Sequence, residues 1–359
     1  KQLAEKAFFL SYLSGAGRYK WVDYLKGIAV LLVVYRHVLI GVQRTGLSVP
    51  EYLEKANMMF YSFRMPLFFI LSGLFISSGL EKKGLQPLLK TKTQTLLLPY
   101  FIWAGLQITL QIIFSAYTNS SRTVIDYTYL FYQPRNLDQF WYLPALFNVT
   151  WIYITIKHFL KPKAIWQLLI GLVLYFMSSY FNKISMMSDW MEFYVFFALG
   201  DNIKEVVLKK ENEKKFSSFW FLLAVIPVFA AAQLYYLYRG ELFFMTSWRG
   251  KLEFLFIAIG GCFTMFLAAQ LLQRLNTVSY LRVVGYHSLY IYVMHVLIAA
   301  PVRVILTKVF HIYNPAILVA SGIFISIIIC ISFYNLFVKN NWLWFLFPGD
   351  KRIRTVSTT

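Results

Sequence analysis

The chain has 359 residues, of which 58% are hydrophobic, 19% are aromatic and only 14% are charged. A soluble domain has about 25% charged residues, so this composition excludes an ordinary soluble fold and indicates a surface that faces lipid. The net charge of +19 does not indicate a nucleic-acid-binding protein, because Lys and Arg fall in short groups between apolar runs and form no basic face.

Ten apolar runs are long enough to cross a membrane, which takes about 20 predominantly apolar residues in a helix. They cover residues 24–43, 59–80, 95–115, 140–158, 164–181, 189–207, 217–237, 251–273, 284–305 and 316–338. The sixth run is the weakest, because Asp201, Lys204 and Glu205 shorten its apolar part. A re-entrant sixth segment would reverse the orientation of everything after it. The sequence therefore predicts an all-α integral membrane protein with about ten transmembrane helices.

Lys and Arg are concentrated in the N-terminal tail, in the loops after the even-numbered runs and in the C-terminal tail. Such segments stay in the cytoplasm, so both termini are predicted to be cytoplasmic, in the cell (plasma) membrane. We expect an interfacial or cytoplasmic segment at 1–20, one membrane domain at 21–338 and a cytoplasmic tail at 339–359. An amphipathic helix and a flexible tail both fit segment 1–20. No removable signal peptide is visible, and Cys262 and Cys330 lie in apolar runs that predict no disulfide framework.

The first run carries ionisable residues, which are costly in hydrocarbon and usually face a cavity or a polar path. From Lys26 to His37 is eleven residues, about 1100° of helical rotation, so both lie on one face about 16 Å apart. Asp23 lies about 40° from this stripe, whereas Arg36 points about 100° away from His37 and is expected to make a different contact. This polar stripe predicts a path from a cytoplasmic mouth at Lys26 to a deep site at His37.

The second run places Arg64 about one and a half turns from its outer end, at a depth close to that of His37. Two costly residues at matching depth on neighbouring helices favour a shared site over a buried His and an Arg that extends to the interface. Ser72 and Gly73 follow in the same run, where a packing role and a place on the path both fit.

Two further groups of residues each allow two interpretations. Lys82, Lys83, Lys90 and Lys92 form a cytoplasmic basic patch that fits lipid headgroups or a phosphorylated ligand. Trp141 and Tyr142, at the outer end of the fourth run, fit an interfacial aromatic belt or a platform for a sugar ring.

His295 lies in the middle of the ninth run, where a site-lining and a structural role are equally open. The outer segment 116–139 carries Arg122, Asp126, Arg135 and Asp138. It is the longest stretch between runs and the expected place for an acceptor. No metal-ligand spacing, phosphate-binding glycine loop or serine nucleophile motif is present.

Five stretches of the sequence, taken together, resemble the acyltransferase 3 family, which consists of membrane enzymes that acylate hydroxyls of surface polysaccharides and other acceptors. The resemblance rests on VDYLKGIAVLLVVYRH, FRMPLFFILSGLF, TLLLPYFIW, FWYLPALF and SLYIYVMHVLI, which occur in the family's order through most of the chain. Two positions depart from the pattern. Lys26 stands where the family usually has Arg, and Lys90-Thr-Lys92 stands where it usually has several Arg, so planar two-pronged phosphate contacts are replaced by point charges.

The resemblance implies an acyl-CoA co-substrate, most simply acetyl-CoA, and an acceptor that is a glycan or a lipid-linked saccharide. Lys26, Lys90, Lys92 and Ser72 are then expected on the donor side, and Asp138, Trp141, Tyr142 and His295 on the acceptor side. His37 would act as general base, or would carry the acyl group itself, and Arg64 would stabilise negative charge or orient the acceptor.

Two other classes of function remain open. A transporter or flippase for a lipid-linked sugar would use His37 and Arg64 without acyl chemistry, but such proteins usually show paired interrupted helices in two halves. A non-catalytic partner within a polysaccharide export assembly would keep the fold without depending on His37. The concentration of polar residues in the first two runs favours the enzyme.

Overall fold

The computed structural model describes residues 19–117, 122–340 and 342–349. Within these residues the chain forms helices and no strands, so the prediction of an all-α protein is confirmed. The predicted N-terminal segment lies almost entirely outside the described residues, as does the end of the C-terminal tail.

The helices follow one another along the chain as short and long segments. The α-helices are α2 (Lys20–Gln43), α3 (Glu51–Met59), α4 (Tyr61–Leu74), α5 (Ile76–Lys83), α6 (Leu85–Lys92), α7 (Leu98–Ile113), α8 (Tyr129–Tyr132), α9 (Tyr142–Leu160), α10 (Ala164–Met177), α11 (Ser185–Leu208), α12 (Lys210–Phe216), α13 (Phe219–Arg239), α14 (Glu241–Thr246), α15 (Trp248–Leu275), α16 (Ser279–Tyr286), α17 (Ser288–Lys308) and α18 (Pro315–Phe333). Short 3₁₀ or π segments are η1 (Thr93–Leu97), η2 (Ser115–Tyr117), η3 (Val124–Thr128), η4 (Pro134–Trp141), η5 (Ser178–Phe181), η6 (Tyr334–Val338) and η7 (Trp344–Leu346).

Every predicted run coincides with helix, and eight helical stretches of the described chain are long and apolar enough to cross a membrane. The two runs without such a stretch correspond to α9 and α11, which are 19 and 24 residues long but more polar. The chain is a multi-pass membrane protein. The count of ten spans and the cytoplasmic position of both termini stay predictions.

Helix α11 is polar because it is enclosed by protein. It packs against α4, α9 and α10 and buries residues along most of its length, including Asp189 and Asp201. Gly73 of α4 and Gly200 of α11 let these two helices touch: a Cβ on Gly73 would come within 2.0 Å of the Phe197 carbonyl oxygen. A helix that faces protein on most sides does not need an apolar surface, which accounts for its weak hydropathy signal.

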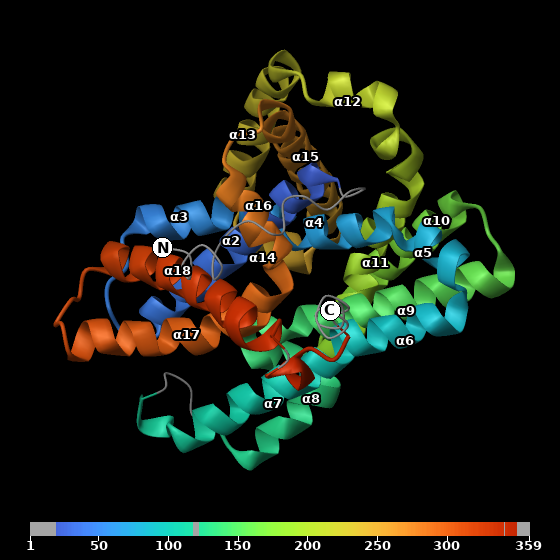
Figure 1. Cartoon of the computed structure of the whole chain (residues 1–359). Coiled ribbons are helices and arrows are strands. Elements are labelled where there is room, and N and C mark those ends of the chain that lie inside the picture. Colours follow the sequence, from blue (N-terminus) through green and yellow to red (C-terminus); the bar gives the residue numbers. More distant parts are fainter. Residues whose placement is uncertain (1–18, 118–121, 341, 350–359) are drawn as a thin grey trace.

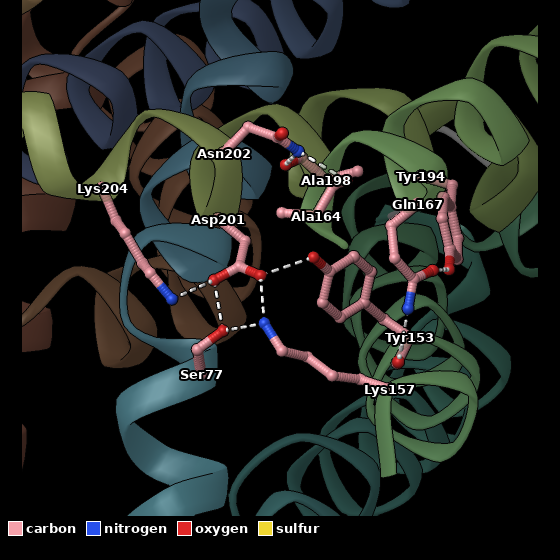
Figure 2. A network of polar contacts seen from close by, with 10 residues as sticks. All are labelled: Ser77, Tyr153, Lys157, Ala164, Gln167, Tyr194, Ala198, Asp201, Asn202 and Lys204. Atoms are coloured by element: carbon pink, nitrogen blue, oxygen red, sulfur yellow. Dashed lines mark hydrogen bonds and ion pairs between the residues drawn. The ribbon is translucent and has the colours of Figure 1, made fainter. Parts of the chain in front are cut away.

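A polar network anchors α11 to its neighbours (Figure 2). The Asp201 carboxylate accepts hydrogen bonds from Ser77 and Tyr153, the latter at 2.7 Å, and pairs with Lys157 at 2.5 Å and Lys204 at 3.1 Å. These donors come from α5, α9 and α11, so one buried carboxylate joins three helices.

Helix α2 occupies the centre of the bundle, where it packs against α4, α15, α16, α17 and α18 (Figure 1). Its crossing with α16 is very close, because a Cβ on Gly285 would lie 1.8 Å from the Asp23 carbonyl oxygen. By contrast, α13 is peripheral and exposes apolar side chains such as Trp220 and Val228, as expected for a helix in contact with lipid. The central position of α2 brings its polar residues inside the protein.

Candidate active site

Two cavities meet at His37. The first has a volume of about 470 Å³ and the second about 400 Å³, and both are lined by His37, Ile40, Arg44 and Asp138. Within the described residues, the His37 ring makes no hydrogen bond, and its closest aromatic neighbour is His295, with ring centroids 5.3 Å apart. The imidazole is therefore positioned by packing and remains available to a molecule in either cavity.

His295 is completely buried and has one fixed tautomer. Its Nδ1 lies 2.9 Å from the carbonyl oxygens of both Ile291 and Tyr292. A ring nitrogen that faces carbonyl oxygens has to carry the proton, so Nε2 is left with a lone pair. That Nε2 has no hydrogen-bond partner among the described residues.

Arg64 and Arg36 approach the first cavity around one tyrosine ring. Arg64 is 2% exposed and donates through Nη1 to the Leu32 carbonyl oxygen at 3.1 Å and to Asn57 Oδ1 at 3.2 Å. The Cζ atoms of Arg36 and Arg64 lie 5.0 Å and 5.4 Å from the centre of the Tyr61 ring. Both arginines line the first cavity together with His37.

As expected, Arg36 makes a different contact from His37, with the Tyr61 ring, but both residues line the same cavity. The cavity covers a wide arc of α2, from Val33 to Arg44, and the long arginine side chain reaches around the helix. Within the described part of the chain Arg36 forms no ion pair or hydrogen bond, and its contact with Tyr61 leaves the guanidinium open to a ligand.

The first cavity is also lined by Trp141, against which Arg135 stacks with its Cζ 4.5 Å from the ring centre. Arg135 also pairs with Asp189 at 2.5 Å and with Glu192 at 3.7 Å. Burial disfavours the charge of Arg135, but these carboxylates outweigh it and hold the arginine pKa above its ordinary value. Arg135 is thus a paired, structural cation that fixes Trp141 at the edge of the cavity.

Asp138 separates the two cavities and is held in an unusual backbone conformation, with φ of 56° and ψ of −110°. Its carboxylate pairs with Arg44 at 2.9 Å and lies 3.9 Å from Arg122. Such a conformation is disfavoured for a residue with a Cβ, and residues of this kind cluster at functional sites. The strained backbone therefore indicates that the position of Asp138 is important for function.

The remaining predicted site residues lie outside both cavities. Tyr142 is buried against Phe69 and Tyr292, and Ser72 Oγ donates to the Phe68 carbonyl oxygen at 2.8 Å. Of the two aromatic residues predicted together, only Trp141 lines a cavity, and its role as a sugar platform or as a belt residue stays a prediction.

The lysines that were predicted to bind the donor lie near the other end of α2. Lys26 and Lys83 lie near enough to Lys92 to act on its charge, and Lys90 is exposed. Lys26 lines neither cavity, and Val30, on the same helical stripe, is fully buried between Lys26 and His37. The two ends of the predicted path are thus separated by packed side chains in this structure.

Several cavity residues were not identified from the sequence. They come from distant segments and include Tyr61, Tyr175, Glu192, Tyr236, Glu241 and Lys251. Lys251 is buried and donates to the Tyr175 carbonyl oxygen and Ser178 Oγ, both at 2.7 Å. A lysine at the first position of an apolar run was a usable signal for Lys251, but aromatic residues such as Tyr175 and Tyr236 are abundant and give no such signal.

Comparison with known proteins gives one match. A family model described as an acyltransferase domain, that of acyltransferase 3, matches residues 19–335. The matched region contains both cavities and every predicted site residue from Lys26 to His295. No curated protein and no solved structure gives a significant match.

Proposed function

The chain belongs to the acyltransferase 3 family and is a membrane acyltransferase; from this premise we propose that it moves an acyl group from cytoplasmic acyl-CoA to a hydroxyl of a surface glycan or lipid-linked saccharide. The simplest donor is acetyl-CoA, in which case the protein is an O-acetyltransferase. The observation that carries the proposal is His37, whose ring has no hydrogen-bond partner among the described residues and lies where two cavities meet. The proposal includes a position in the cell membrane with both termini in the cytoplasm.

His37 acts as the general base in this proposal. It takes the proton from the acceptor hydroxyl while that oxygen attacks the thioester carbonyl carbon. A C–O bond forms, the C–S bond breaks, and the CoA thiolate leaves and takes up the proton that His37 had accepted. The alternative, transient transfer of the acyl group to His37, needs a second chemical step and is less economical.

The neighbours of His37 have separate tasks. Arg64, held by the Leu32 carbonyl and Asn57, directs its charge to the oxyanion that develops on the carbonyl oxygen. His295, with its proton fixed on Nδ1, presents Nε2 as an acceptor beside the His37 ring and favours the imidazolium formed during transfer.

The two substrates enter from opposite ends of α2. The lysines near Lys26 receive the phosphates of the nucleotide, and the flexible arm of the donor passes along α2 to His37, about 16 Å away. This route requires the side chains around Val30 to move. The acceptor occupies the first cavity, whose aromatic residues offer flat surfaces for sugar rings and whose Asp138 offers a hydrogen-bond acceptor.

The test is thiol release from acetyl-CoA and longer acyl-CoA by the purified protein in nanodiscs, with and without candidate glycans. His37→Ala is expected to lower turnover by roughly 10²–10⁴-fold while acyl-CoA still binds, because a positioned general base contributes about that factor. The matched control is His158→Ala, an exposed histidine at the end of α9. If wild type neither binds nor turns over any acyl-CoA, transport replaces catalysis as the leading proposal.

A further inference from the structure

The second cavity has a different character from the first. Its volume is about 400 Å³, and its walls are mainly aliphatic side chains from α2, α7 and α17. Representative members are Val38, Val42, Leu110, Leu297, Ala300 and Val304. Its polar wall residues besides His37 are Arg44, Gln107, Gln111, Asp138 and Arg303. Arg44 pairs with Asp138, and Gln107 accepts a hydrogen bond at 2.8 Å from Gln139, which lies outside this wall.

This cavity begins at His37 and extends away from the lysine end of α2. Along α2 it runs from His37 to Arg44, about 10 Å, and along α17 from Val296 to Ile305, about 13 Å. At its far end Phe114 and Ile305 are 52% and 48% exposed, so it approaches the outer surface of the helix bundle. The space is therefore elongated, mainly apolar and in contact with the proposed base at one end.

We propose that the second cavity binds the alkyl chain of the acyl donor, and that the protein accepts acyl groups longer than acetyl. This inference rests on the proposed function, which places the thioester carbonyl at His37. A donor that arrives from the lysine end presents its acyl group first, so the chain must occupy the space beyond His37. The methyl of an acetyl group fills a small part of 400 Å³, whereas a medium-length chain covers the aliphatic wall.

The alkyl chain of a lipid-linked acceptor fits this location less well. In such an acceptor the reacting hydroxyl belongs to a sugar, and a phosphate lies between that sugar and the lipid chain. A lipid chain that filled the cavity up to His37 would displace the sugar that has to react there. An acyl chain is attached directly to the carbonyl carbon, so its first methylene lies next to His37 whenever the donor is in place.

The experiment measures the affinity of S-alkyl-CoA thioethers, from ethyl to octyl, for the protein in nanodiscs. These thioethers lack the carbonyl and are not transferred, so binding is measured without turnover. Ala300→Phe fills the cavity from α17, and Leu110→Trp fills it from α7 as a second, independent variant. The matched control is Ala320→Phe, an exposed position on α18 that does not line the cavity.

We expect affinity to rise by about fourfold for each added methylene in wild type and Ala320→Phe, the value for burial of one methylene in an apolar site. The rise should flatten in Ala300→Phe and Leu110→Trp. An equal rise in all four proteins overturns the proposal, because the chain then inserts into the bilayer. Equal affinity for ethyl and octyl derivatives in wild type also overturns it.

Turnover separates this proposal from the proposed function. In wild type, thiol release from octanoyl-CoA relative to acetyl-CoA should exceed that ratio in Ala300→Phe. If thioethers bind with the expected chain dependence but no acyl-CoA releases thiol with any acceptor, the alkyl site stands and acyl transfer fails. If Ala300→Phe leaves the thioether series unchanged but weakens a lipid-linked acceptor, the occupant is the acceptor chain and the proposal is overturned.

Discussion

The surroundings of Asp201 and of His37 are both polar and enclosed by helices, but they are completed in different ways. At Asp201 two hydroxyls and two ammonium groups converge on one carboxylate, so each oxygen has its partners inside the protein (Figure 2). At His37 the imidazole, the Arg36 guanidinium and the hydroxyl of Tyr236 have no hydrogen-bond partner within the described residues, and all three line a cavity.

This difference distinguishes a polar network that stabilises the fold from a group of polar residues that can bind a ligand. Buried polar groups are almost always hydrogen-bonded, because an unpaired one loses its interaction with water without compensation. A network that is complete by itself stabilises the fold, as Asp201 does for α5, α9 and α11. A group of incomplete polar residues around a cavity is arranged for a ligand that completes it.

The largest effect is expected at Asp201, and the contrast with His37 fails if Asp201 does not stabilise the fold. Asp201→Asn leaves Lys157 and Lys204 without a counterion, and breaking a buried pair costs about 3–5 kcal/mol of the free energy of unfolding. We expect about 3 kcal/mol, because the two lysine side chains are 22% and 23% exposed and retain some contact with water. Denaturant unfolding in detergent measures the loss.

The control for Asp201→Asn is Glu205→Gln, an exposed acidic residue one turn further along α11, which should leave stability unchanged. Folded Asp201→Asn should keep the wild-type turnover per molecule. A variant that is stable but inactive would place Asp201 in the chemistry and remove the distinction between the two regions.

Arg64 provides the next largest effect. Loss of one donor to a developing oxyanion costs about 10²–10³-fold in kcat, and Arg64→Gln is expected to show it. Arg64→Lys keeps the charge, but an ammonium cannot reproduce the planar set of donors that reaches Leu32, Asn57 and the cavity at once, so it should recover only part of the loss.

Steady-state kinetics with varied acyl-CoA measures the effect of Arg64, with Arg274→Lys, which lines neither cavity, as the control. An increase in KM at unchanged kcat would show that Arg64 binds substrate in the ground state and does not stabilise the transition state.

Much of this site could be predicted from the sequence, because ionisable residues in a membrane helix are rare and helical periodicity places them on faces. The meeting of His37 and Arg64 in one cavity follows from that logic, whereas the continuous path from Lys26 to His37 is interrupted by packed side chains such as Val30. The reach of Arg36 around α2 and the entry of Lys251 and Tyr236 from distant helices depend on tertiary packing, which spacing along one helix does not encode. The same limit applies to α11, whose charges reduce its hydropathy because its partners lie in other helices.

A smaller effect, on the KM for the acceptor, is expected at Arg36. Its guanidinium stacks on Tyr61 and forms no ion pair within the described part of the chain, so an anionic or hydroxyl-rich acceptor can complete it. Arg36→Gln is expected to raise the KM for the acceptor by about tenfold, the value of one charge-assisted hydrogen bond, with little change in kcat. A fall in kcat at constant acceptor KM would instead place Arg36 with Arg64 in transition-state stabilisation.

The smallest effect on stability is expected at Asp138, where the two roles meet in one residue. Asp138→Gly relieves the backbone conformation at φ 56° and ψ −110°, a strain of about 1–3 kcal/mol. It also removes the pair with Arg44, whose side chain is 45% exposed, and such pairs are worth about 0–1 kcal/mol. The free energy of unfolding should therefore rise by about 1.5 kcal/mol, within a range of about 0–3 kcal/mol, while the acceptor KM increases because the carboxylate between the cavities is lost. Asp138→Asn separates the two contributions, since asparagine tolerates positive φ and keeps a hydrogen-bond acceptor. If Asp138→Gly is clearly less stable than wild type and binds acceptor normally, Asp138 belongs with Asp201 as a structural anchor, and strain at the cavity wall has no functional meaning.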